Sequence, residues 1–136
     1  MLSLETLKEL EALQERSHEA YPEGGLLYTY VEAANQAHCR FKCVTPRENL
    51  SHVPEDVLKE LARLLQVSQG EYGLEKADPP FIQQASDLMD KLRTDVSFGE
   101  VYISFEDKGT DMEAIIHMAR RTDNRYFSLE LWWSID

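Results

Sequence analysis

Histidine and cysteine side chains, which bind zinc and act as catalytic bases or nucleophiles, are few in this sequence. They are four histidines and two cysteines: His18, His38, His52, His117, Cys39 and Cys43. They form neither an HExxH motif nor the cysteine–histidine spacing of a zinc finger. Any chemistry they perform therefore depends on how the fold arranges them.

The densest group of these side chains is HCRFKC, residues 38–43. On a strand the two thiols would share a face but lie about 13 Å apart, too far for a common metal or a disulfide. On a helix they would be neighbours, but with His38 they would supply only three ligands. We therefore interpret Cys39 and Cys43 as small core residues and expect no metal and no other cofactor.

Catalytic motifs are missing as well. The sequence has no GxGxxG, no P-loop and no GxSxG motif. On a strand, His38 would point away from the neighbouring Cys39, and nothing marks His117 as a general base. The 25 acidic residues cannot be paired for acid–base chemistry without a pocket to place them in. We expect no catalytic residues and predict that the protein is not an enzyme.

Charge is the most informative property of the composition. The 136 residues include 25 acidic and 14 basic ones, giving a net charge of -11. Such a balance disfavours nucleic acid and anionic membranes as partners, because both are bound through Lys and Arg. Acidity serves solubility in many small proteins, but it also attracts a basic protein partner. Residues 1–23 hold six acidic and two basic residues, and residues 95–136 hold nine and four.

The N-terminal segment is predicted to form a helix over residues 3–20, with Ser3 as its N-cap. An apolar stripe at helical spacing predicts its buried face, and it consists of Leu4, Leu7, Leu10 and Leu13. The other face carries Glu11, Glu15 and Glu19, four residues apart, which we call the acidic ridge. Like charges at this spacing repel each other weakly. The ridge is either a solvated face or a surface that receives cations.

Two further helices follow. One covers about 54–66, and the other begins at Pro79 behind an Asp78 cap, with a turn-rich link at 66–78 between them. Residues 26–45 favour a hairpin with strands at 26–31 and 39–45 and a tip at Asn35–Gln36. A helix across VEAANQAHC is the alternative.

After Thr94 the pattern changes from helical to alternating. FGEVYISFED, MEAIIHMARR and RYFSLELWWSID are predicted to be three strands joined by short turns. We therefore expect a single α+β domain over residues 1–136. An antiparallel meander, extended by the N-terminal hairpin, forms a sheet of three to five strands with about three helices on one face.

The strand parity also predicts what each face of this sheet carries. Val101, Ile103 and Phe105 should face the helices, and in the last strand so should the set Phe127, Leu129, Leu131, Trp133 and Ile135. The opposite face then carries aromatics among carboxylates: Glu100, Tyr102, Glu106, Tyr126, Glu130 and Trp132. These residues either bind a partner, as interface aromatics do, or pair across strands for stability.

The N-terminus lacks the basic and apolar regions of a signal peptide, so we expect a cytoplasmic protein. In size and composition the chain resembles the small acidic proteins that neutralise a toxin or nuclease, of which bacterial immunity proteins are an example. This resemblance implies a non-enzymatic inhibitor, monomeric or homodimeric, that binds a basic partner through the aromatic–acidic face and the acidic ridge. The alternatives are a chaperone-like or adaptor domain, using the sheet face or the 66–78 link, and a small-ligand binder or enzyme.

Overall fold

The structure is a computed structural model that describes residues 1–33, 53–71, 77–120 and 122–136. The elements are α1 (Leu4–Ala20), β1 (Gly25–Ala33), α2 (Glu55–Ser68), α3 (Pro79–Val96), β2 (Glu100–Asp107), β3 (Asp111–Arg120) and β4 (Arg125–Ser134). The predicted hairpin tip, the strand at 39–45, and the HCRFKC segment lie outside the described residues, as does His52.

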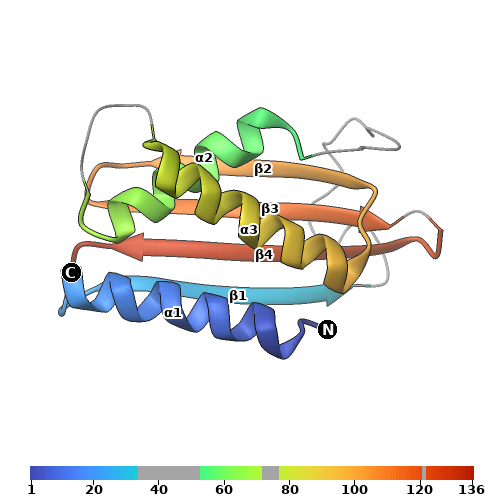
Figure 1. Cartoon of the computed structure of the whole chain (residues 1–136), viewed down its shortest axis with the longest axis horizontal. Coiled ribbons are helices and arrows are strands. Elements are labelled where there is room, and N and C mark those ends of the chain that lie inside the picture. Colours follow the sequence, from blue (N-terminus) through green and yellow to red (C-terminus); the bar gives the residue numbers. More distant parts are fainter. Residues whose placement is uncertain (34–52, 72–76, 121) are drawn as a thin grey trace.

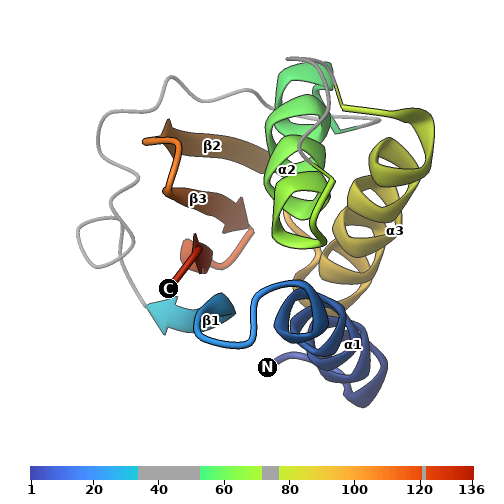
Figure 2. The ribbon, with the colours of Figure 1, turned by 90° about the vertical axis from the view of Figure 1, so that its left-hand side faces the viewer.

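The described strands form one antiparallel sheet in the order β1-β4-β3-β2. Strands β2, β3 and β4 are the predicted meander, and β1 joins it beside β4 (Figure 1). The helices α1, α2 and α3 all lie on the same face of this sheet (Figure 2). The prediction of an α+β fold with helices on one face is confirmed. None of the helices in the described segments is long and apolar enough to cross a membrane.

Helix α1 begins as predicted, because the Ser3 side chain accepts a hydrogen bond from the backbone N–H of Thr6 at 3.3 Å. The predicted apolar stripe is only half right. Leu10 and Leu13 are buried, but Leu4 is 67% exposed and Leu7 is 38% exposed. Steps of three residues fall about 60° short of a full turn, so the three steps from Leu4 to Leu13 drift about halfway around the helix. Thr6 takes a buried position on this helix instead.

Helices α2 and α3 each bury one apolar face in the core. Their fully buried side chains include Leu61, Leu64, Leu65, Leu88, Met89 and Leu92. Asp78 precedes α3, but its side chain makes no capping hydrogen bond. Its backbone N–H donates instead to Oε1 of the buried Gln66 at 2.8 Å, which ties the start of α3 to α2. Helix α2 runs to Ser68, slightly beyond its predicted end.

The core lies between the helices and the inner face of the sheet. The strand parity is confirmed there, because Val101, Ile103, Phe127, Leu129, Leu131 and Trp133 are all buried. The Trp133 ring contacts Tyr21 edge to face at 5.1 Å, and the Tyr21 hydroxyl donates to the Val67 carbonyl at 2.8 Å. Ile135 departs from the parity and is 41% exposed, because β4 ends at Ser134.

Candidate protein-binding surface

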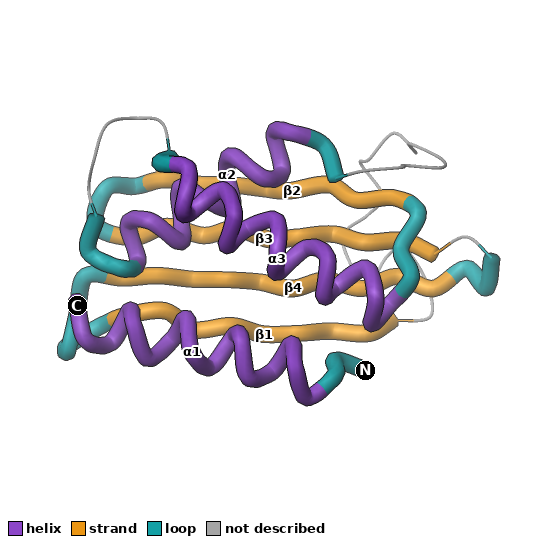
Figure 3. The backbone as a smooth tube through the Cα atoms, viewed as in Figure 1, coloured by secondary structure: helices purple, strands orange, loops and turns teal. Residues whose placement is uncertain are grey.

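The face of the sheet away from the helices, here called the outer face, is organised in rows that cross the strands. Figure 3 shows the four strands side by side. One row runs from β1 to β2 through Leu27, Trp132, Glu113 and Glu106. The next two rows are Thr29, Glu130, Ile115 and Ser104, and then Val31, Ser128, His117 and Tyr102. The outer face therefore carries Tyr102, Glu106, Glu130 and Trp132, as the strand parity predicted for these four.

Three large apolar side chains are exposed near the β1 edge of this face. Leu27 is 57% exposed, Val31 is 40% exposed and Trp132 is 38% exposed. Leu27 faces Trp132 across the strands, and Val31 lies four residues further along β1. We call these three residues the apolar strip. Trp132 is thus exposed while its neighbour Trp133 is in the core, which confirms the opposite faces predicted for the two tryptophans.

The acidic ridge borders the same edge of the sheet. Glu11, Glu15 and Glu19 are exposed and line a groove of about 540 Å³ between α1 and β1. Leu27 lines this groove as well as belonging to the outer face. Gln14 holds the two elements together, because its Nε2 donates to the Leu26 carbonyl at 3.2 Å. Leu27 is therefore the residue that the groove of the acidic ridge and the outer face share.

The ridge carboxylates are available to a cation. Within the described segments, none of the three makes an ion pair. The basic residues nearest to them on α1 are Lys8 and Arg16, and both are exposed. The three carboxylates therefore remain solvated and repel one another at their four-residue spacing.

Two of the predicted site residues are buried. Glu100 is 2% exposed and Tyr126 is 3% exposed, so neither belongs to the exposed surface. Tyr126 packs in a small cluster with Ala33 and Ala119, and its hydroxyl donates to Oδ1 of Asn124 at 3.1 Å. These residues form the last row across the sheet, with Glu100 opposite Ala119. The role of Tyr126 is therefore to pack this end of the sheet.

His117 lies beneath Tyr102 on the outer face. The two rings stack with centroids 5.6 Å apart, and His117 Nε2 is hydrogen-bonded to Ser104 Oγ at 3.2 Å. The imidazole is only 2% exposed, whereas Tyr102 is 42% exposed. A hollow of about 480 Å³ adjoins them and is bordered by Glu106 and Glu113. We interpret His117 as a cross-strand support that fixes the orientation of Tyr102.

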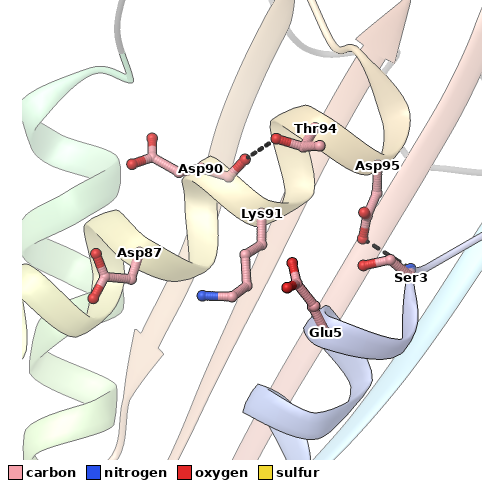
Figure 4. Close-up of a pocket in the computed structure, with 7 residues that line it drawn as sticks. All are labelled: Ser3, Glu5, Asp87, Asp90, Lys91, Thr94 and Asp95. Carbon is pink, nitrogen blue, oxygen red and sulfur yellow. Dashed lines mark hydrogen bonds between the residues drawn. The ribbon is translucent and has the colours of Figure 1, made fainter.

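A second acidic group lies on the helical side and has a structural role. It lines a pocket of about 340 Å³ with Ser3, Glu5, Asp87, Asp90, Lys91, Thr94 and Asp95 (Figure 4). Asp95 Oδ2 accepts hydrogen bonds from the Ser3 backbone N–H at 3.0 Å and from Thr6 Oγ1 at 2.5 Å. These bonds join the start of α1 to the end of α3.

Lys91 of the same pocket forms an ion pair with Glu9 at 2.7 Å, and this hydrogen bond raises the pKa of Lys91. The ion pair is a second link between α1 and α3. Among the described residues, no group of three or more histidine, cysteine or acidic side chains is arranged to hold a metal.

Sequence reasoning missed three members of the exposed surface, namely Leu27, Val31 and Glu113. Alternation within β1 was a usable signal for the first two, because Leu26, Tyr28 and Tyr30 pack on the core side. The pairing of β1 with β4 was not predictable, since register between distant strands depends on the whole sheet.

Comparison of the chain with protein-family models, curated proteins and solved structures gave no match. Function is therefore inferred from the surface itself.

Proposed function

We propose that this protein is a non-enzymatic acidic binding module, and specifically an immunity-type inhibitor that neutralises a basic toxin or nuclease in the bacterial cytoplasm. The observation that supports this proposal is the apolar strip with carboxylates on both sides. The acidic ridge lies on one side of Leu27, and Glu113 lies on the other side of Trp132. Tryptophan is enriched in binding hot spots, and polar residues form the rim around the core of an interface.

The charge of the chain suits this role. A net charge of -11 attracts a basic protein over long distances and raises the rate of encounter. The carboxylates around the apolar strip would then pair with Lys or Arg of the partner and fix its orientation. The active site of an enzyme that binds a phosphate backbone is basic, so an acidic surface can cover it.

Affinity capture from the native cell, followed by binding measurements with the purified partner, tests this proposal. We expect a basic partner whose association slows as salt is raised, because ions screen charges across a Debye length of about 8 Å at physiological ionic strength. Trp132→Ala should weaken binding, whereas Leu4→Ser, which changes an exposed leucine outside the surface, should not. A neutral partner with salt-independent binding would indicate an adaptor domain instead.

A further inference from the structure

The apolar strip lies between two groups of carboxylates, and their spacing indicates the shape of what binds. On one side, across the groove from Leu27, is the acidic ridge of α1. On the other side, Glu113 lies next to Trp132 on β3. A matching partner segment must therefore present one apolar stripe with positive charge on both of its flanks.

The width of this surface matches an α-helix. Neighbouring strands lie about 4.8 Å apart, so β1 and β3 are separated by about 10 Å. An α-helix with its side chains is about 10–12 Å across. A helix seated over Leu27 and Trp132 would therefore cover the outer face from β1 to β3. Glu113 would lie on one of its flanks, and on the other would lie the β1 edge, which the groove of the acidic ridge borders.

The length of the surface also fits. Leu27 and Val31 are separated by four strand residues, about 13 Å, which is between two and three turns of a helix. Along α1, residues four apart rise by about 6 Å, close to the pitch of a partner helix that carries Lys or Arg once per turn. In a strand, successive side chains point to opposite faces, so one strand cannot direct charges to both flanks of an apolar stripe on one face.

We propose that this surface binds a basic amphipathic helix of the partner, two to three turns long, with its apolar stripe on Leu27, Val31 and Trp132. This inference rests on the proposed function and specifies the element of the partner that is recognised. Helices of this kind commonly bind apolar grooves through residues one turn apart. Addition of a strand at β1 is disfavoured, because Gln14 of α1 already occupies the Leu26 carbonyl of this edge strand.

Synthetic peptides test the inference on the full chain. The first peptide is a basic amphipathic helix with leucines on one stripe and lysines on both flanks. The second has the same composition in an order that destroys the stripe, and the third alternates leucine and lysine as a strand does. We expect only the first to bind tightly. Its binding should shift Trp132 emission to shorter wavelength, a signal that Trp132→Phe removes while the buried Trp133 still emits.

Substitutions then locate the site. Leu27→Ser should weaken the helical peptide by about tenfold or more, as loss of a central apolar anchor does. Leu4→Ser is the matched control, since Leu4 is 67% exposed outside the surface. Glu15→Gln and Glu113→Gln, one on each flank, should each weaken binding about two- to five-fold. Asp90→Asn on α3 controls for general loss of charge.

The outcomes separate this inference from the proposed function. If the reordered peptide binds as tightly as the amphipathic peptide, or the alternating peptide binds more tightly than it, the inference of a helix is wrong. The proposal of an acidic binding module is not affected by that result. If none of the three peptides binds, but a captured basic partner does bind and needs Trp132 for binding, only the inference of a helix is overturned. If none of the peptides binds and no basic partner is captured, the proposed function is overturned together with the helix.

Discussion

Leu27 and Trp132 face each other across β1 and β4 on the outer face, and both are exposed, Leu27 at 57% and Trp132 at 38%. Leu27 is also part of the groove beside the acidic ridge. This pair therefore connects two features that are far apart in the sequence, a helix near its start and the last strand. The acidic ridge and the outer face, which are separate in the sequence, therefore adjoin each other at Leu27.

The first prediction concerns Trp133, the core neighbour of Trp132. Trp133→Ala should lower the free energy of unfolding by about 3–5 kcal/mol, because it leaves a cavity where the ring contacts Tyr21. Trp133→Phe should cost clearly less, because the indole N–H makes no hydrogen bond within the described residues. Urea unfolding followed by circular dichroism measures both. Equal losses for the two substitutions would contradict the account of this core.

Asp95 should be important for stability, not for binding. Asp95→Ala removes the acceptor of two hydrogen bonds that join α1 to α3, from the Ser3 N–H and the Thr6 hydroxyl. We expect the free energy of unfolding to fall by about 1–3 kcal/mol. Asp90→Asn, in the same pocket but with no such side-chain bond, is the control. If the control destabilises the protein equally, the pocket's charge rather than these bonds is responsible.

Glu60 should make stability depend on pH. Burial raises its pKa, and the nearby negative charge of Asp56 raises it further. The folded state therefore holds this proton more tightly than the unfolded state, so stability falls as pH rises through and above the usual glutamate range. Glu60→Gln should stabilise the protein at neutral pH by about 0.5 kcal/mol or less. At acidic pH, where Glu60 is protonated in both states, the difference should disappear.

The acidic ridge should show opposite effects on stability and on binding. Glu15 lies four residues from both Glu11 and Glu19, so Glu15→Gln removes two repulsive pairs. We expect a gain of a few tenths of a kcal/mol in the unfolding free energy. The same substitution should slow association with a basic partner, most clearly at low salt. A variant that is more stable and binds with an unchanged rate would show that the ridge is only a solvated face.

Much of the fold was predictable from local patterns. Alternation with a period of two residues was sufficient to place Trp133 in the core and Trp132 on the outer face, because adjacent strand residues always point to opposite faces. The helical stripe was less reliable. Leu4 and Leu7 follow helical spacing, but they rotate away from the side that Leu10 and Leu13 bury.

The site was less predictable than the fold. Tyr126 and Glu100 have the parity of the outer face, yet they are buried in its last row beside Ala33 and Ala119. That row depends on which strands pair and in which register, and local alternation contains no such information. For the same reason, the position of Leu27 opposite Trp132 and beside the ridge groove could only be seen in the assembled sheet.

The most direct test of the central claim is the dissociation constant of the captured partner for Trp132→Ala, compared with Leu4→Ser, with unfolding measured for both. We expect Trp132→Ala to bind at least about tenfold more weakly while its unfolding free energy changes by about 0.5 kcal/mol or less. Leu4→Ser should bind as the unmodified protein does. Unchanged binding by a folded Trp132→Ala variant would contradict the account, because the outer face would then not be the binding surface.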